Sequence, residues 1–212
     1  MTTAIIGTGN IGSVLAAELA AGGTDLLIAG NSDLKAQELA STLNGQARAV
    51  SVRDAIVEAD IIVFAVWLDV SKKLIAEFRQ ELIGKIVVDP SNPIAPDGEG
   101  GFVKTIGEND SSGQQLAALL PSDAVLVKAF GSLGAESLSS ARQRAPQRAV
   151  LFYAADDQKA GDRVAHLIRA AGFDPVSVGG LDQSIRMEVF GDLHEFGGLG
   201  GPVSREEALG KV

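Results

Sequence analysis

A glycine-rich segment near the start of the chain combines the residue types and the spacing of a phosphate-binding turn. It follows a short apolar run, Ala4–Ile6, and precedes an expected helix, Ile11–Ala21. In such a unit the first glycine permits a tight turn, the second lets the backbone approach a pyrophosphate, and the third lets helix and strand pack closely. The N–H groups at the helix start then hold the phosphates, whereas the alternative is a tight turn that binds no ligand. The predicted dinucleotide site comprises Gly7, Thr8, Gly9, Asn10, Ile11 and Gly12.

The end of the second expected strand decides which dinucleotide fits. A site for NAD usually places Asp or Glu there, to accept a hydrogen bond from the ribose 2′-hydroxyl. Here the residues are Asn31 and Ser32, which can donate hydrogen bonds to a 2′-phosphate, and Lys35 adds a positive charge nearby. Asp33 suits the helix N-terminus through the helix dipole. The sequence therefore favours NADPH, although plain capping of the helix explains Ser32 equally well.

The fourth expected strand ends in Ala65, Val66 and Trp67. In a doubly wound sheet ligands lie at the carboxyl ends of the strands, so we expect these residues to contact the ribose or the nicotinamide of the cofactor. Trp67 is the single tryptophan of the chain, and an aromatic ring here would form one wall of the pocket. The alternative for Trp67 is ordinary packing in the core or at a subunit interface.

Strand and helix patterns alternate along the whole chain. This order predicts a Rossmann-like α/β fold with a doubly wound, mostly parallel sheet and helices on both faces. We expect a single compact domain over residues 1–212, in which residues 1–90 form the dinucleotide-binding core and residues 91–212 complete the sheet and the acceptor pocket. The expected strands are Ala4–Ile6, Leu26–Ala29, Ala47–Val50, Ile61–Val66, Lys85–Asp89, Ala124–Phe130, Ala149–Ala154 and Pro175–Val178. The expected helices are Ile11–Ala21, Asp33–Leu43, Val52–Ala59, Val70–Gln80, Ser112–Leu120, Gly134–Arg142, Lys159–Ala171 and Leu181–Phe196, with a long loop over Pro90–Asp110.

Composition narrows the classes of function. The chain has 212 residues, no cysteine, two histidines and a formal net charge of −9. The absence of cysteine excludes disulfides and thiolate chemistry, and His166 and His194 are too far apart in sequence to suggest a metal site. We expect both histidines to lie at the surface. The acidic charge disfavours nucleic acid or an anionic membrane as partner. The apolar runs are too short for a membrane span and no basic segment precedes Ala4, so we expect a cytoplasmic protein.

Four segments of the chain resemble the F420-dependent NADP oxidoreductase family, whose nucleotide domain is related to the reductase domain of STEAP proteins. They are GTGNIG at Gly7–Gly12, VVDPSNP at Val87–Pro93, VKAFGSLGAESL at Val127–Leu138 and VGGL at Val178–Leu181. The resemblance covers nearly the whole chain. It implies hydride transfer between NADP(H) and a planar acceptor, coenzyme F420 or a flavin such as FMN or FAD. The protein then mainly holds the two rings face to face.

The resemblance also implies where the acceptor binds. Its pocket is lined by the loop after the fifth strand, the loop after the sixth strand and the glycine-rich end, Gly197–Gly201. The implied acceptor-binding residues are Asn92, Pro93, Phe130, Gly131, Ser132 and Leu133. The alternative is that these residues only turn the chain. No catalytic acid or base and no metal ligand is assigned.

Two other functions remain open from the sequence. In the first, NADPH reduces a small carbonyl, imine or quinone, which requires a Lys, Tyr or His beside the nicotinamide to protonate the product. In the second, the protein is a sensor that binds NADPH without turnover and has no ring-sized cavity beside the nicotinamide. The expected partner is a small-molecule redox acceptor, and the family together with the apolar segments near Trp67 and the last helix suggests a homodimer.

Overall fold

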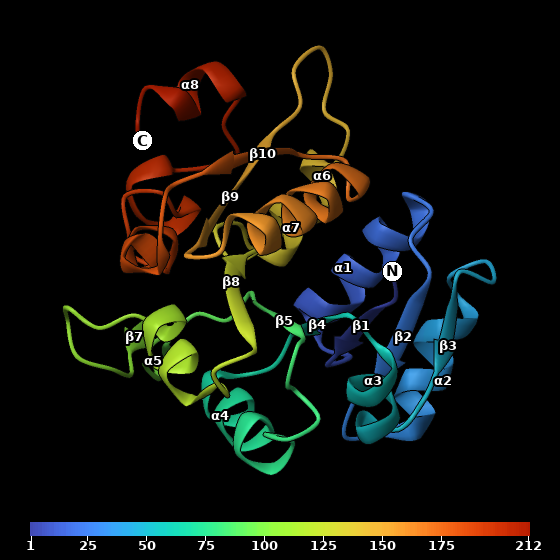
Figure 1. Cartoon of the computed structure of the whole chain (residues 1–212). Coiled ribbons are helices and arrows are strands. Elements are labelled where there is room, and N and C mark those ends of the chain that lie inside the picture. The colour runs from blue at the N-terminus through green and yellow to red at the C-terminus, as the bar shows by residue number, and fades with distance from the viewer.

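The computed structural model describes residues 1–212 and contains an eight-stranded sheet with the order β10-β9-β8-β5-β4-β1-β2-β3. All neighbouring strands are parallel except β8 and β9, so the predicted mostly parallel α/β fold is confirmed. The sheet strands are β1 (Thr3–Ile6), β2 (Leu26–Ala29), β3 (Ala47–Ala49), β4 (Ile61–Phe64), β5 (Ile86–Asp89), β8 (Val125–Ala129), β9 (Val150–Ala155) and β10 (Asp174–Ser177). Figure 1 shows β3 at one edge of this sheet and β10 at the other.

Helices cover both faces of the sheet and create two apolar cores. One core of 28 buried residues lies under α1 (Asn10–Ala21), α2 (Asp33–Ser41), α6 (Ala135–Ala141) and α7 (Gln158–Ala170). The other, of 25 buried residues, lies under α3 (Val52–Glu58), α4 (Leu68–Glu77), α5 (Ser112–Leu119), η1 (Leu181–Met187) and α8 (Arg205–Leu209). Successive strand residues alternate between the two cores because side chains along a strand point to opposite faces.

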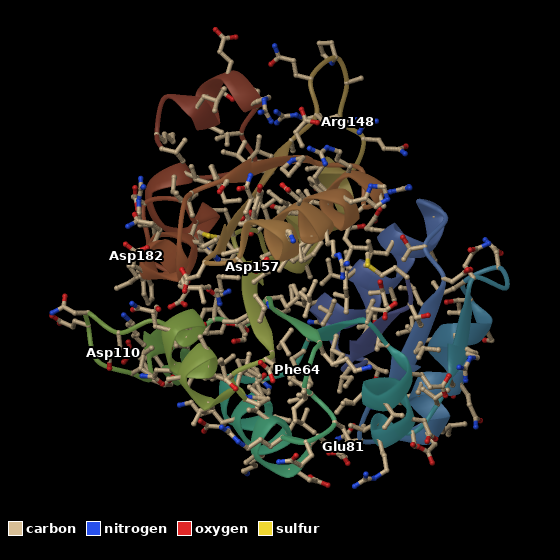
Figure 2. The ribbon with its side chains drawn as sticks, in the orientation of Figure 1. Phe64, Glu81, Asp110, Arg148, Asp157 and Asp182 are labelled. Carbon is tan, nitrogen blue, oxygen red and sulfur yellow. The ribbon has the colours of Figure 1, made fainter.

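Strand β4 illustrates this alternation. Ile61 and Val63 belong to the first core, whereas Ile62 and Phe64 belong to the second. Figure 2 marks Phe64, whose side chain is fully buried inside the molecule. A strand that is buried on both faces reads as a continuous apolar run, which is the pattern that the sequence shows here.

The order of the strands reverses beside β1. From β1 the chain continues outward through β2 to β3, and then returns to the other side of β1 to form β4 and β5. The residues Ile6 and Phe64 are partners in the register of β1 and β4, so the turns after these two strands lie side by side. This reversal is the topological switch point at which doubly wound folds bind ligands.

Most predicted helix boundaries agree with the structure, but the last helix was predicted wrongly. Instead of one helix over Leu181–Phe196, the chain forms the 3₁₀ helix η1, an irregular stretch, and the kinked turn η2 (Glu195–Leu199). Glu188 leaves the helix in an extended conformation, and Phe190 adopts a positive φ of 76°. A left-handed residue cannot continue a right-handed helix, so the chain turns here.

The region predicted as a loop, Pro90–Asp110, contains a small hairpin. It is formed by β6 (Ile94–Pro96) and β7 (Phe102–Lys104), which pair antiparallel outside the main sheet. Figure 1 shows this hairpin projecting beside α5. The charged tail forms the short helix α8, which begins with a capping box between Ser204 and Glu207. None of the helices has the length and apolarity that a membrane span requires.

Candidate functional site

The turn between β1 and α1 can be formed only with glycine at its first and last positions. Gly7 has a φ of +123°, and a Cβ atom there would overlap the carbonyl oxygen of Ala65 and lie 2.9 Å from Val66 Cγ1. A Cβ atom at Gly12 would overlap the carbonyl oxygen of Gly7. These contacts bring the start of α1 against the turn that follows β4.

The middle glycine of the turn faces open space. No atom lies within 4 Å of the position that a Cβ atom of Gly9 would take, and Gly9 caps α1 without any side-chain hydrogen bond. The N–H groups of Asn10, Ile11 and Gly12 donate to no other group, and the first turn of α1 carries no acidic residue. An uncapped helix N-terminus with free N–H groups is an anion-binding site, so these residues fit a pyrophosphate.

The turn after β4 borders the glycine-rich turn. Ala65 and Val66 are half-buried against Gly7, while the Trp67 side chain is 59% exposed and caps α4. The alternative that Trp67 packs in the core is therefore wrong. An exposed indole at the switch point can contact a ligand that lies across the ends of β1 and β4.

The residues after β2 lie at the same edge of the sheet. The Thr8 side chain is 3.5 Å from the position of a Cβ atom at Gly30, so the first two strand ends adjoin. Ser32 caps α2 by accepting a hydrogen bond of 3.4 Å from the backbone N–H of Lys35, which confirms the capping prediction. Asn31 and the Lys35 side chain are exposed. Both are therefore available to a phosphate group.

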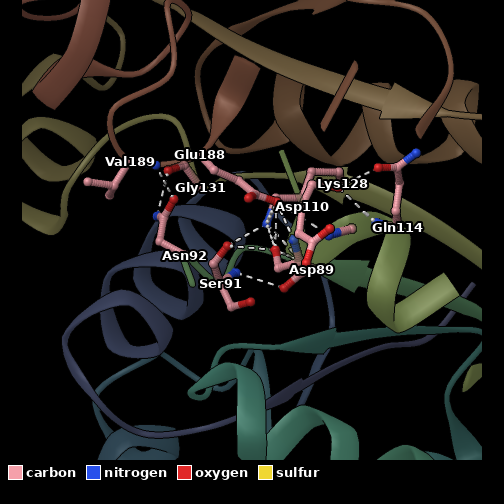
Figure 3. Close-up of polar contacts among 12 residues, drawn as sticks. Asp89, Ser91, Asn92, Asp110, Gln114, Lys128, Gly131, Glu188 and Val189 are labelled. Atoms are coloured by element: carbon pink, nitrogen blue, oxygen red, sulfur yellow. Dashed lines mark hydrogen bonds and ion pairs between the residues drawn. The ribbon is translucent and has the colours of Figure 1, made fainter. Parts of the chain in front are cut away.

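Asn92, in the loop after β5, is held on both sides by the protein. Its Nδ2 donates to the carbonyl oxygen of Gly131 at 3.0 Å, and its Oδ1 accepts from the N–H of Val189 at 2.7 Å. The neighbouring residue Pro93 is buried. Figure 3 shows Asn92 between Gly131 and Val189. The side chain of Asn92 thus joins the loops after β5 and β8 to the segment after η1.

The loop after β8 is covered in this structure. Phe130 has a φ of +65° and its side chain is fully buried in the first core, and Gly131, Ser132 and Leu133 are buried as well. The segment after η1 contacts this loop, with the N–H of Glu195 donating to the Ser132 carbonyl at 3.0 Å. The predicted acceptor residues are therefore brought together, but their side chains are not exposed.

The glycine-rich end does not extend away from the molecule. A Cβ atom at Gly197 would overlap the carbonyl oxygen of Gly191, and one at Gly198 would lie 2.7 Å from that of Asp192. Two phenylalanines of this segment are exposed, Phe190 by 56% and Phe196 by 59%.

His194 is buried, so the prediction of a surface position was wrong, whereas His166 is exposed as expected. The Nδ1 atom of His194 accepts the N–H of Phe196 at 3.0 Å. Burial and the nearby charge of Lys128 lower the pKa of His194 to about 4, although a hydrogen bond with the backbone of Gly131 acts in the opposite direction, so the ring is neutral at pH 7.

The sequence interpretation missed a buried polar cluster formed by Asp89, Ser112, Lys128 and Glu188. Lys128 Nζ donates to Asp89 Oδ2 at 2.8 Å, to Ser112 Oγ at 2.7 Å and to the carbonyl oxygen of Ser91. Glu188 Oε1 accepts from Ser112 N and Oγ, each at 2.8 Å, and from Gly113 N at 3.3 Å. All four side chains are at most 1% exposed. A lysine inside an otherwise apolar strand was the signal that could have revealed this cluster.

Neither of two surface hollows contains a predicted site residue. One, of about 300 Å³, lies between α5, the start of β8 and η1. The other, of about 570 Å³, lies beside β10 and α8. The structure has no group of three or more Asp, Glu or His side chains arranged to hold a metal ion.

The doubly wound sheet and the open glycine turn at its switch point define an α/β dinucleotide-binding protein. A model of the family described as NADP oxidoreductase, coenzyme F420-dependent, matches residues 2–93. A hypothetical protein from Sinorhizobium meliloti is 30% identical, with a TM-score of 0.84, over 97% of this chain and 96% of that one. The chain belongs to the F420-dependent NADP oxidoreductase family and is an NADP-dependent oxidoreductase.

Other solved structures share the fold. A candidate F420-dependent NADP reductase from Arthrobacter sp. FB24 is 24% identical over 86% of each chain, with a TM-score of 0.74. A pyrroline-5-carboxylate reductase from Coxiella burnetii is 16% identical over 87% of this chain and 60% of that one, with a TM-score of 0.61. None of the curated proteins matches the chain.

Proposed function

We propose that the protein transfers a hydride between NADP(H) and a planar deazaflavin or flavin acceptor. The observation that carries the dinucleotide half of this proposal is the uncapped start of α1, where Gly9 faces open space and three N–H groups have no acceptor. The family description and the printed description of the Arthrobacter protein support coenzyme F420 as acceptor. When bound, NADPH supplies a hydride, and the reduced acceptor takes up a proton from solvent.

Three groups of residues hold the cofactor in this proposal. The backbone of Gly7–Gly12 binds the pyrophosphate, because the N–H groups of Asn10, Ile11 and Gly12 have no acceptor in the protein and Gly9 faces open space. Asn31 and Lys35 bind the 2′-phosphate, and Ser32 keeps the capping role that orients α2. Ala65, Val66 and Trp67 lie along the ribose and the nicotinamide.

The acceptor side uses the covered loops. Asn92, Pro93 and the Phe130–Leu133 loop border the ring-binding position, together with Gly197–Gly201. Since the Phe130–Leu133 loop is buried and the segment after η1 is hydrogen-bonded to it through Glu195 and Ser132, acceptor binding in this proposal requires that segment to shift. Hydride transfer between two flat rings needs close, parallel positioning more than a strong acid or base.

A second candidate function is NADPH binding without turnover. The burial of Phe130, Gly131, Ser132 and Leu133 favours this candidate, because the sensor requires no ring-sized space beside the nicotinamide. A third candidate function, reduction of a small carbonyl, imine or quinone, is distinguished by the experiment described below.

We also propose that the protein is a homodimer, which sedimentation of the purified protein would test.

The experiment is a titration with NADPH and NADH, followed by stopped-flow oxidation of bound NADPH. Coenzyme F420, FMN, FAD and a panel of small carbonyls, imines and quinones are added in turn. Rapid oxidation by F420 or a flavin supports the proposal and names the acceptor. Oxidation only by a small carbonyl, imine or quinone refutes the ring acceptor, and tight binding with every acceptor inert supports the sensor.

A further inference from the structure

The buried polar cluster contains more negative than positive charge if both acids are ionised. Lys128 is the single cation, while Asp89 and Glu188 are both fully buried beside it, at 2.8 Å and 3.6 Å from Nζ. A buried ion pair is stable only when its charges balance and its hydrogen bonds are satisfied. With Glu188 protonated the cluster is neutral, and with Glu188 ionised it carries one uncompensated negative charge.

The count of protons in the cluster leads to the same conclusion. Ser112 Oγ accepts a hydrogen bond from Lys128, and its one proton faces two carboxylate oxygens, Asp89 Oδ2 at 2.9 Å and Glu188 Oε1 at 2.8 Å, with the Ser91 carbonyl oxygen farther away at 3.5 Å. A hydroxyl group donates only one hydrogen bond. Glu188 Oε2 is buried and has no hydrogen-bond partner. A proton on Glu188 Oε1 removes the conflict, because Oε1 then donates to Ser112 Oγ and the hydroxyl proton is left for Asp89 Oδ2.

The charged groups that face Glu188 come from each element around it. Burial is the largest effect and raises the pKa of Glu188 above its ordinary value. Lys128 on β8 and the hydrogen bonds from Ser112 and Gly113 at the start of α5 lower this pKa, whereas Asp89 on β5 raises it. His194, from the segment after η1, has a pKa of about 4 and therefore adds no charge at neutral pH.

The cluster connects directly to the loops that border the acceptor. Lys128 holds the carbonyl oxygen of Ser91, the residue before Asn92. Glu188 precedes Val189, whose N–H donates to Asn92 Oδ1 at 2.7 Å. Figure 3 shows the cluster and Asn92 side by side, linked through these neighbouring residues. The side chain of Glu188 therefore fixes α5, and its backbone fixes the position of Val189 against Asn92.

We propose that Glu188 is a positioning residue of the hydride transfer, which in its protonated form anchors the segment after η1 to Ser112 and, through Val189, holds Asn92 in place beside the acceptor. This inference rests on the proposed function, since Asn92 borders the acceptor only if that function is correct. Ionisation of Glu188 places a second carboxylate beside Asp89 and loosens the anchor.

The direction of the pH effect follows from the raised pKa. A group whose pKa is higher in the folded state stabilises the fold fully at low pH, and this contribution is lost as the pH rises through the folded-state pKa. The anchor therefore weakens as the pH rises through the folded-state pKa of Glu188. Activity with the acceptor should fall over the same pH range, while NADPH binding at the glycine turn should not.

Three variants test this proposal: Glu188→Gln, Glu188→Ala and, as a matched control, Glu77→Gln at the exposed end of α4. Glutamine keeps the shape and the neutral charge of the protonated acid, so Glu188→Gln should keep the activity that the wild type shows at low pH and lose the fall with rising pH. Glu188→Ala removes the anchor and should lower kcat/KM for the acceptor by about 10- to 100-fold, as a small misplacement of reacting groups does. The Kd for NADPH should stay within about twofold in all variants, because the glycine turn shares no hydrogen bond with the cluster.

Hydrogen exchange at the amides of Ser112 and Val189 gives a readout that does not depend on turnover. In the wild type, protection of both amides should fall as the pH rises, after correction for the intrinsic exchange rate. In Glu188→Gln the protection should not depend on pH. If none of the acceptors tested oxidises NADPH in the presence of the wild type, the proposed function fails. The exchange data still test the anchor in that case.

Two results would overturn the inference. A fall in activity or protection with rising pH that persists in Glu188→Gln assigns the titration to another group. Unchanged kcat/KM and unchanged exchange in a folded Glu188→Ala protein show that Glu188 positions nothing.

Discussion

Replacing Gly9 by aspartate should separate folding from cofactor binding. Gly9 lies at the cap position of α1 with φ −80° and ψ −170°, a conformation that any residue adopts, and nothing lies within 4 Å of its Cβ position. Aspartate is a favoured capping residue and its charge suits a helix N-terminus, so the free energy of unfolding should stay equal or rise by a few tenths of a kcal/mol.

The same substitution should abolish tight NADPH binding. The carboxylate accepts hydrogen bonds from the free N–H groups of α1 and so competes with the pyrophosphate for them. It also repels the phosphate charges. A hydrogen bond to a charged group contributes about 1.5–3 kcal/mol. Loss of two such bonds therefore weakens binding by about 3–6 kcal/mol, or about 10²- to 10⁴-fold.

Titration calorimetry with NADPH and urea unfolding measure the two effects on one preparation. The control is Gly7→Ala, in which the Cβ atom overlaps Ala65 and the φ of +123° is strained. This variant should lose stability by about 1–3 kcal/mol from the backbone strain alone. Wild-type NADPH affinity in a folded Gly9→Asp protein would refute the placement of the phosphates at α1.

Three further predictions concern single side chains. Asn31→Asp places a carboxylate near the 2′-phosphate and should shift the preference towards NADH. Its repulsion from two phosphate charges at about 4 Å in water amounts to about 2 kcal/mol. An equal ratio of NADPH to NADH affinity in the variant and the wild type would place the specificity elsewhere. Because the pKa of His194 is lowered to about 4, the unfolded chain binds a proton on this ring at a higher pH than the fold does, and stability is lost as the pH falls. Between pH 7 and pH 4 the free energy of unfolding, measured with urea, should therefore fall by up to about 3 kcal/mol more in the wild type than in His194→Gln. The same pH dependence in both proteins would contradict this. Trp67 is the single tryptophan and is exposed at the switch point, so its fluorescence should change when NADPH binds; binding that leaves the emission unchanged would show that the indole is not beside the cofactor.

The glycine turn and the order of strands and helices could be predicted because their signals are local. A strand buried on both faces needs a continuous apolar run, and a tight strand-to-helix turn needs glycine where a Cβ atom would collide. Both requirements fall within a few consecutive residues, as in Ile61–Phe64 and Gly7–Gly12. The prediction of the last helix was wrong because its end has no such local signal. Phe190 adopts a positive φ, and a phenylalanine side chain does not indicate that conformation.

The sequence by itself therefore determined the fold class and the glycine turn between β1 and α1. Only the tertiary structure brought Lys128 together with Asp89, Ser112 and Glu188, which lie between 16 and 60 residues away from it in the chain. It likewise exposed Trp67 and buried His194. Burial and charge pairing depend on which segments the folded sheet places side by side, and no local pattern of residue types encodes that arrangement.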